Sequence, residues 1–466
     1  MEAPGGSSTD GEAKIAVALS GGGHRSCLWA LGVLLYLTDA GKQHEVGSIA
    51  SVSGGSIANG TIAQCVDYRA ASPAELESLI GRVAKRITRG TVLAPWTTKL
   101  YIGLMLLATL AVLVVPWLLP VANPLKPLIL LAGVVPLAWL FAARARVAEA
   151  AFSRTLFAVP GRPKLLREVD TNPLIDHIFC ATDLHAGENV YFSSRFVCSW
   201  RFGLGEPAEL PLARVVQASA GFPGAFPVRW LPTAPHKFID PKQSEAALTR
   251  RMALVDGGVY NNMGDQWAQG QFKNAKPGPS GVAPPQELVV ASGSAGLQWS
   301  NLFGLRWPVV GGVLSLMRDK SVLYDDGNSV RRSTLVSRFD LAAHDTVGLR
   351  GALVHIEQSP FRVPDAFVEP DKAELWPDRA RRAQAVLARL GEPDELDALR
   401  THWQALAKAN AKIHTTLKAL SKQQTVDLLY HSYLLAMVDL HVILGYPLLA
   451  IPERGRFEGL LGGAHA

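Results

Sequence analysis

Charged residues are scarce in this chain. Asp, Glu, Lys and Arg together make up 18% of its 466 residues, while hydrophobic residues make up 48%. An average soluble protein has about 25% charged residues. A disordered chain or a charged coiled coil needs the opposite balance, so both classes are excluded. The 42 glycines and 30 prolines follow no period, which excludes a collagen-like protein.

Cysteine is scarce as well. The four cysteines, Cys27, Cys65, Cys180 and Cys198, are too few for a disulfide framework, and their spacing is not that of metal ligands. We therefore expect a reducing compartment. The chain carries a net charge of +6, but its basic residues do not gather into aromatic-interleaved patches or a nucleic-acid motif. We expect no nucleic-acid partner.

Two strand–turn–helix units open the chain after a polar start. Residues 1–13 lack the apolar core of a signal peptide, which predicts a disordered tail. Residues 14–19 predict a buried strand, a turn follows, and the apolar residues 27–37 predict a buried helix. The repetition of this unit from residue 48 predicts an α/β domain with a parallel sheet. Further strands are expected at 174–183, 190–194, 252–256 and 288–292, and helices from about 376 onward, with a buried apolar one at 426–451.

A long apolar stretch interrupts this pattern. Residues 100–125 contain no charge, and after Lys126 residues 127–143 are again uncharged. A helix of about 20 residues spans the hydrocarbon core of a bilayer, and about 17 is the lower limit. Prolines between the two runs favour a bend. We expect a membrane hairpin at 99–143, either spanning or re-entrant; the alternative is a monotopic or buried pair of apolar helices.

Basic residues flank the hairpin on both outer sides, whereas its connecting loop has only Lys126. The positive-inside rule then places both flanks in the cytoplasm. We expect a membrane protein whose catalytic part faces the cytoplasm and whose basic helix faces anionic headgroups. The flanking basic residues are Arg82, Lys85, Arg86 and Arg89 before the hairpin, and Arg144 and Arg146 after it.

Ser53 is the candidate nucleophile. It lies where a predicted strand runs into a helix, in the sequence Ala-Ser-Val-Ser-Gly-Gly that ends at Gly55. A nucleophile elbow, G-x-S-x-G, needs small neighbours two positions to either side of the serine. Gly55 fits this pattern, and Ser51 replaces the first glycine. A serine between glycines usually lies in a plain turn, so the neighbouring motifs must decide between a turn and a nucleophile elbow.

A glycine-rich turn follows the first strand, at Gly21, Gly22 and Gly23. Consecutive glycines before a helix expose backbone N–H groups that suit an anionic oxygen. The alternative is a dinucleotide-binding loop, but Ser26 replaces the last glycine of G-x-G-x-x-G, and the next strand ends in serine rather than an acidic residue. Asp256, followed by Gly257 and Gly258, is a further candidate, with a simple turn as an equally probable interpretation when it is considered alone.

These three motifs occur in the order found in patatin-like phospholipases, lipid acyl hydrolases with a Ser–Asp dyad, which the chain resembles. Two more stretches fit: residues 181–187 (ATDLHAG) and residues 217–227 (QASAGFPGAFP), the latter similar to the family's A-S-x-A-x-P-x-x-F segment. The matches cover residues 14–65 and about 175–265. The hairpin and everything beyond about residue 360 lie outside the resemblance.

The resemblance implies a three-layer α/β fold around a central, mostly parallel sheet, a lipid ester substrate, and no metal or cofactor. We expect a catalytic domain at 14–98 and 144–375, the hairpin as an insertion, and a helical C-terminal extension at 376–466. Ser53 would attack the ester, Asp256 would take its proton, and the pocket would be mostly apolar. Oxyanion donors would be Gly21, Gly22 and Gly23, with Arg25, Gly55, Gly257 and Gly258 in support.

Two other functions remain open at this stage. An α/β-hydrolase triad would use a histidine base that follows Asp256 in the chain, such as His344 or His355. A membrane scaffold could keep the fold without activity, and Ser51 is the motif departure that favours it. Oligomeric state, headgroup and acyl position are not indicated by the sequence.

Overall fold

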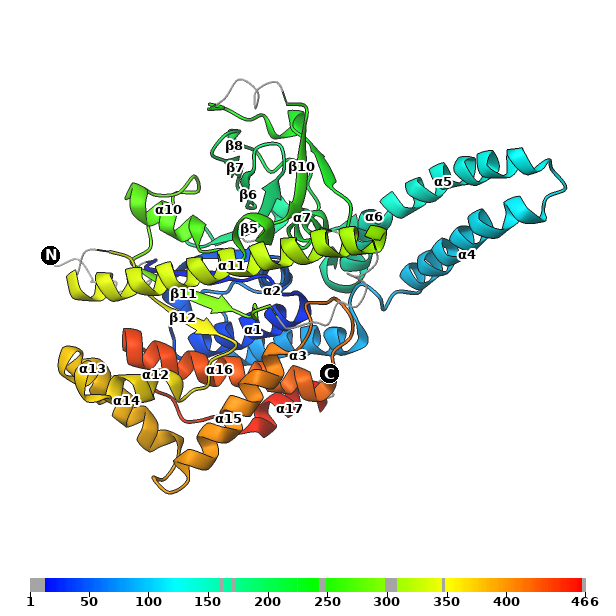
Figure 1. The fold of residues 1–466 in the computed structure, drawn as a ribbon. Helices are drawn as coiled ribbons and strands as arrows, with labels where there is room; N and C mark the ends of the chain where they lie inside the picture. Colours follow the sequence, from blue (N-terminus) through cyan, green and yellow to red (C-terminus); the bar gives the residue numbers. More distant parts are fainter. Residues whose placement is uncertain are drawn as a thin grey trace.

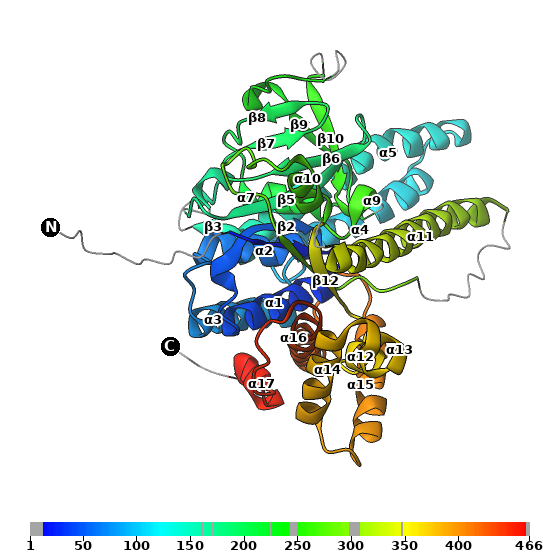
Figure 2. The same cartoon turned by 90° about the vertical axis from the view of Figure 1, so that its left-hand side faces the viewer.

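The structure, a computed structural model, describes residues 13–159, 162–169, 172–223, 225–242, 249–297, 308–345 and 348–462. Of the expected disordered tail, only Ala13 falls within these ranges. The described residues form a mixed β-sheet covered by helices on both faces, with two helices projecting from the body (Figure 1; Figure 2). The expected α/β class is therefore confirmed.

Ten strands form the main sheet of the described residues, and five of them, in the order β12-β11-β1-β2-β5, run parallel. The sheet continues antiparallel through β6, β7 and β8, while β10 pairs antiparallel with both β5 and β9. A separate pair, β3 (Ala158–Val159) and β4 (Arg162–Pro163), lies outside it. The strands of the sheet are β1 (Ile15–Leu19), β2 (Val46–Val52), β5 (Asp176–Asp183), β6 (Glu188–Phe192), β7 (Val197–Ser199), β8 (Gly203–Gly205), β9 (Arg229–Pro232), β10 (Arg251–Asp256), β11 (Glu287–Ser292) and β12 (Arg350–His355).

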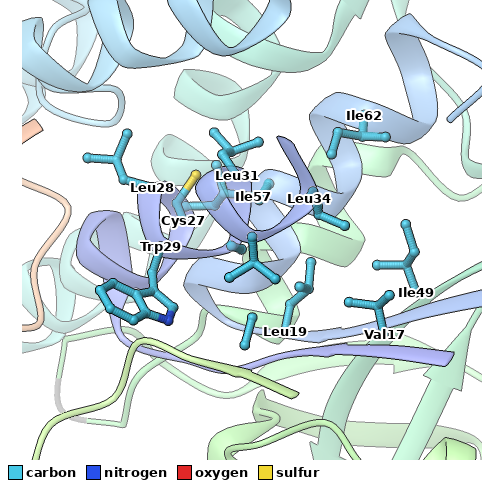
Figure 3. Packing of buried hydrophobic residues seen from close by; sticks show 14 of the residues in the cluster. Val17, Leu19, Cys27, Leu28, Trp29, Leu31, Leu34, Ile49, Ile57 and Ile62 are labelled. Atoms are coloured by element: carbon cyan, nitrogen blue, oxygen red, sulfur yellow. The ribbon is translucent and has the colours of Figure 1, made fainter. Parts of the chain in front are cut away.

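Alternate residues of β1 point to opposite faces of the sheet, and both sets are buried. Val17 and Leu19 pack under α1 (Gly23–Asp39) and α2 (Gly54–Cys65), as Figure 3 shows. Ala16 and Ala18 pack in a second cluster with side chains of α10 (Gln266–Asn274) and α11 (Pro308–Asp345). Burial on both faces explains why the central strands are apolar throughout instead of alternating.

The first face carries further helices near the hairpin. α3 (Pro73–Arg89) starts at a capping box of Ser72 and Glu75, with Pro73 at the first helical position. α6 (Arg144–Phe152) and α7 (Leu212–Ser219) contribute buried residues to the same core. A short helix, α9 (Gly258–Asn261), follows β10 directly.

The predicted apolar hairpin forms two helices, α4 (Trp96–Leu118) and α5 (Lys126–Ala142). They project away from the body (Figure 1), and only 6% of each apolar window is buried. Mean hydropathy is 2.2 for the first and 2.0 for the stretch that includes the second, so both are candidate membrane spans by length and composition. The interpretation of this stretch as a pair of buried helices is wrong, because its side chains face outward.

A third apolar helix, α16 (Lys422–Leu444), is also long enough to span a membrane, but 78% of its window is buried. It packs against α1 and β12, as expected for a buried helix. The helix ends seven residues earlier than the apolar run, because Gly445 adopts a left-handed conformation with φ of 78° and Pro447 follows.

The C-terminal helices begin earlier than the sequence indicates, and they join the main core. Buried side chains from Trp403 to Phe457 belong to the same hydrophobic cluster as α1 and β1. Residues 376–466 therefore complete one face of the α/β layer wherever they are described. The remaining helices are α12 (Arg362–Val368), α13 (Pro370–Leu375), α14 (Pro377–Leu390), α15 (Leu396–Ala411) and α17 (Arg454–Gly462).

Candidate active site

The ends of β2 and β10 meet head to head on one edge of β5. Val52, the last residue of β2, pairs with Cys180, and Asp256, the last residue of β10, pairs with the adjacent Ala181. Since β2 runs parallel to β5 and β10 runs antiparallel, both strands end at this junction. Ser53 follows Val52 directly, so the topology brings Ser53 to Asp256 although about 200 residues separate them in the sequence.

Ser53 and Asp256 both line one cavity of about 400 Å³, called here the Ser53 cavity. Ser53 is 9% exposed and Asp256 is 4% exposed, so each side chain is nearly shielded from water. The walls are mixed in polarity: Phe222, Val259 and Leu297 are apolar, whereas several other lining residues are polar. Apolar atoms form the larger part of the lining, as expected, although polar groups share it.

Ser53 has the strained backbone of a nucleophile elbow, with φ of 52° and ψ of −114°. Its N–H donates to the hydroxyl of Ser219 at 3.0 Å. A Cβ on Gly54 would lie 2.0 Å from the carbonyl oxygen of Gly23, and one on Gly55 would lie 2.6 Å from that of Leu19. Only glycines allow this close approach of the elbow to the glycine-rich turn.

Ser51, the departure from the elbow motif, has a structural role of its own. Its side chain is fully buried and donates to the carbonyl of Ile178 at 2.9 Å. It also accepts from Ser56 at 3.1 Å and from Asn59 at 2.9 Å. Ser56 and Ser219 share a further hydrogen bond of 2.8 Å. Ser51 therefore belongs to a hydrogen-bond network that fixes the elbow, and it gives no support to the scaffold interpretation.

Backbone contacts hold Asp256 at the cavity. One carboxylate oxygen, Oδ1, accepts from the N–H of Gly258 at 2.8 Å, and the Asp256 carbonyl accepts from the hydroxyl of Thr182 at 3.0 Å. A Cβ on Gly257 would lie 2.3 Å from the carbonyl oxygen of Cys180. Gly257 and Gly258 are thus needed where the chain leaves β10 against β5, as the D-G-G motif suggested.

The three glycines of the first turn do not contribute equally. The N–H of Gly21 donates to the backbone carbonyl of Asn262 at 2.9 Å, so this amide is already used. Gly22 and Gly23 have φ of 145° and 63°, and no acceptor for their N–H groups is found among the residues that the structure describes. They lie at the positive end of the α1 dipole. Of the three N–H groups expected to act as oxyanion donors, those of Gly22 and Gly23 therefore have no described acceptor, whereas that of Gly21 has one.

Arg25 braces the glycine-rich turn from inside the protein. Its guanidinium is 4% exposed; Nε donates to the carbonyl of Gly293 at 2.8 Å, and one terminal nitrogen donates to the carbonyls of Ala411, at 3.2 Å, and Ile413. Burial lowers the pKa of Arg25 to about 10, so it stays charged at neutral pH. These contacts describe a residue that braces the loop, which is a supporting role.

His24 is buried under the C-terminal region rather than exposed to solvent. Its N–H donates to the carbonyl of Thr416 at 3.0 Å, and its ring contacts the carbonyl of Lys418 at 2.8 Å and the hydroxyl of Thr91 at 2.7 Å. A Cβ on Gly23 would lie 2.4 Å from the Thr416 carbonyl oxygen. Residues 411–418 thus pack directly on the glycine-rich turn.

Lowering the pH from 7 to 5 is expected to destabilise the fold through His24 and His177. Burial lowers the pKa of His24 to about 4 and that of His177, which contacts Asn59, to about 3. Both folded pKa values lie below that of the unfolded chain, which is about 6.5. The unfolded state therefore binds more protons below that pH, and the stability of the fold decreases as the pH drops from 6.5 toward 4.

The expected loss of stability follows from about 1.4 kcal/mol per pH unit, so each histidine contributes up to about 2 kcal/mol by pH 5. Urea unfolding at both pH values measures it, and a His24→Gln variant should lose part of the pH dependence. If the stability of His24→Gln depends on pH as strongly as that of the wild type, His24 does not cause the loss.

Some residues of the cavity were not predicted. Tyr324 and Asp325 reach it from α11, and His414 and Thr415 from the loop after α15. A Cβ on Gly258 would lie 2.8 Å from the Tyr324 hydroxyl oxygen and 3.0 Å from Oδ1 of Asp256, so both oxygens lie close to Gly258. Burial, and next the Asp256 carboxylate, raise the pKa of Tyr324, which keeps its hydroxyl protonated. No local motif marks any of these positions.

Of the two candidate histidine bases, His355 is not placed at Ser53. The ring of His355, at the end of β12, contacts the hydroxyl of Ser292 at 3.2 Å, Arg332 at 3.2 Å and a carboxylate oxygen of Glu357 at 3.4 Å. The side chain of His344 lies outside the described residues. In the part of the chain that the structure describes, no group of three or more His, Cys, Asp or Glu side chains is arranged to hold a metal ion.

The chain belongs to the patatin-like phospholipase family, whose family model matches residues 17–264. The motifs identified at Gly21–Gly23, Ser53 and Asp256 all lie within this range. The resemblance seen in the sequence is therefore confirmed, and with it the patatin fold of the catalytic part.

Solved structures that resemble the chain include the following three, all at low identity. Human GIVD cytosolic phospholipase A2 is 14% identical, with 61% of this chain and 43% of that chain covered and a TM-score of 0.35. The same protein with methyl gamma-linolenyl fluorophosphonate is 15% identical, with 44% and 29% covered and a TM-score of 0.28. VipD from Legionella pneumophila is 12% identical, with 97% and 90% covered and a TM-score of 0.27. The chain spans less than half the length of the human enzyme, and no protein of curated function matches it in sequence. The family assignment rests on residues 17–264.

Proposed function

We propose that this protein is a membrane-associated serine acyl hydrolase that cleaves phospholipid or lysophospholipid acyl esters with a Ser53–Asp256 dyad. The observation that carries the proposal is the junction of β2 and β10 on β5, where both side chains line the same shielded cavity. The strained backbone of Ser53 and the two unused N–H groups of the glycine-rich turn are what an acyl-transfer site requires.

In the proposed reaction Asp256 accepts the hydroxyl proton of Ser53 while Oγ attacks the ester carbonyl carbon. The N–H groups of Gly22 and Gly23 stabilise the oxyanion of the tetrahedral intermediate. The intermediate collapses, the bond to the leaving alcohol breaks, and Asp256 gives its proton to that alcohol. Asp256 then takes a proton from water, whose oxygen attacks the acyl-enzyme, and the proton returns to Ser53 as the fatty acid is released.

A backbone donor orients the proposed base. A carboxylate is a weak base for a serine hydroxyl, so its environment decides its orientation and strength. Asp256 Oδ1 accepts from the N–H of Gly258 at 2.8 Å, and Tyr324 lines the same cavity. With Oδ1 held by this backbone donor, the second carboxylate oxygen, Oδ2, is the one we assign to Ser53.

Reaction of the detergent-solubilised protein with a fluorophosphonate probe tests the proposal. Such probes react with activated serines, so covalent labelling at Ser53 and release of fatty acid from phospholipid are expected. Labelling without lipid hydrolysis would leave a serine hydrolase with another ester substrate. A well-folded protein that is not labelled would contradict the hydrolase function and leave a membrane scaffold.

We further propose that α4 and α5 insert into the bilayer and that the rest of the chain faces the cytoplasm. Support comes from their exposed apolar surface and from the basic residues at both outer ends, Arg89 before the hairpin and Arg144 and Arg146 after it. Insertion would hold the Ser53 cavity near the bilayer, where lipid esters are concentrated.

Cysteine labelling is expected to reveal this orientation. Cys65, at the end of α2, is the exposed native thiol on the body, so a membrane-impermeant maleimide should modify it only after cells are permeabilised. A Cys65→Ser variant gives the background. In that variant, Lys126→Cys places a thiol at the start of α5, next to the loop between the two helices. Labelling of this thiol in intact cells indicates spanning helices, whereas protection indicates a re-entrant hairpin. Labelling of Cys65 in intact cells would show that the body of the protein faces outward, which contradicts the proposed orientation.

A further inference from the structure

Two adjoining cavities lie beside α6, where the hairpin joins the body. Their volumes are about 380 Å³ and about 800 Å³, and Arg146, Arg214 and Arg229 line both. Arg154 lines the smaller cavity and Arg251 the larger. These five side chains, called here the arginine cluster, come from α6, the π-helical turn that follows it (Ser153–Phe157), α7, β9 and β10. The fold assembles them, because they are not contiguous in the sequence.

The arginine cluster carries more positive charge than its surroundings neutralise. Glu149 is the one acidic residue among those lining the two cavities, and it pairs with Arg214 at 3.1 Å and with Arg229. Burial, and next the neighbouring Arg146, lower the pKa of Arg229 to about 10, which still leaves it charged at neutral pH. Like charges so close together make an anion a favourable occupant.

The surroundings of the arginine cluster fit a membrane surface. α6 continues from α5, and Arg154 donates to the hydroxyl of Thr97 at 2.6 Å, at the start of α4. Figure 1 shows α6 at the base of the projecting hairpin. Trp139 and Trp230, 76% and 52% exposed, both line the larger cavity, together with the apolar Val228. Exposed tryptophans are typical of the membrane–water interface.

We propose that the arginine cluster binds the phosphate of an anionic membrane lipid. Guanidinium groups bind phosphate oxygens in pairs, and basic pockets at the cytoplasmic ends of membrane helices suit lipid headgroups. The site is separate from the Ser53 cavity, with which it shares no lining residue. The proposal rests on the membrane insertion of the hairpin proposed above, and it is independent of the catalytic dyad.

The segment between α7 and β9 connects the two sites. Phe222 and Pro223 line the Ser53 cavity, and five residues later Pro227 and Val228 line the larger cavity of the arginine cluster. An anionic lipid bound at the cluster would therefore lie against the same chain segment that forms one wall of the Ser53 cavity, on the side of the molecule from which the hairpin projects.

Binding of phosphatidylglycerol to the full-length chain in neutral-detergent micelles tests the proposal. A Ser53→Ala background prevents consumption of the lipid, so the result does not depend on the proposed hydrolase activity. Phosphatidylcholine with the same acyl chains is the zwitterionic comparison, and glycerol 3-phosphate is the soluble phosphate. The site variant combines Arg146→Gln with Arg251→Gln, two exposed arginines of the larger cavity. Its matched control combines Arg381→Gln with Arg389→Gln, exposed on α14, away from the hairpin (Figure 1).

Phosphatidylglycerol is expected to bind more tightly than phosphatidylcholine, and the site variant should weaken its binding by about tenfold or more while the control does not. Replacing the same two arginines with lysine should restore part of the affinity. If the double glutamine variant does not fold, Arg154→Gln replaces it. Equal binding of both lipids, or equal losses in the site and control variants, would overturn the proposal. If glycerol 3-phosphate binds as tightly as phosphatidylglycerol, the arginine cluster binds a soluble phosphate and the proposal of a lipid ligand is wrong.

Discussion

Ser53→Ala is expected to abolish fluorophosphonate labelling and to lower the rate of ester hydrolysis by about four orders of magnitude or more. In the proposed mechanism the nucleophile has no substitute, because Ser53 is the serine that has the strained elbow backbone at this cavity. Ser78→Ala, at an exposed position of α3, is the matched control and should leave both activities unchanged. Hydrolysis that survives in Ser53→Ala would exclude Ser53 as the nucleophile.

Asp256→Asn separates the dyad from a triad. The amide oxygen can still accept from the N–H of Gly258, so the local fold should persist while the base is lost. Labelling and hydrolysis are expected to fall nearly as far as in Ser53→Ala, because nucleophile and base act as a unit. If labelling is retained in Asp256→Asn, a histidine must serve as the base, and replacing His414, which lines the Ser53 cavity, and then His344 and His355 would identify it.

Arg25→Met is expected to lower the free energy of unfolding by about 3 kcal/mol or more, since hydrogen bonds to charged groups contribute about 1.5–3 kcal/mol each. Removal of the buried charge offsets part of this cost, but the carbonyls of Gly293, Ala411 and Ile413 would lose their donor inside the protein. Hydrolysis should fall as well, because the glycine-rich turn loses its brace.

Urea unfolding at neutral pH measures the effect, with Arg82→Met on the exposed face of α3 as the control. Arg25→Lys should fall between the two, since an ammonium group cannot reach all three carbonyls in the geometry of a guanidinium. An Arg25→Met protein as stable and as active as the wild type would show that the contacts to residues 411–413 are not needed to hold the turn.

The sequence predicted those parts of the site that depend on contiguous residues. The elbow at Ser53, the glycine-rich turn and the D-G-G segment are each a strand end followed by small residues, and steric requirements within a few residues are visible in the sequence. The contact of Gly54 with the Gly23 carbonyl is the tertiary counterpart of those local patterns. The hairpin was predictable for a similar reason, because hydropathy and length are properties of a single segment.

The tertiary structure decided which groups face the cavity. The use of the Gly21 amide by Asn262 depends on a residue more than 200 positions away, and the Arg25 contact with Ile413 joins residues 388 positions apart. Tyr324 reaches the Ser53 cavity from α11, and nothing near it in the sequence marks that position. Such contacts depend on how helices pack across the sheet, which no local pattern encodes.

The amino-acid sequence by itself therefore determined the class of fold, the candidate nucleophile and base, and the apolar hairpin, because each follows from the chemistry of a short stretch. Only the tertiary structure decided that β2 and β10 end at the same point on β5, that residues 411–418 close over the glycine-rich turn, and that arginines from five elements gather at the base of the hairpin. The physical reason is that strand pairing and helix packing join residues far apart in the chain, and their free energy depends on complementary surfaces that form only when the whole core is assembled.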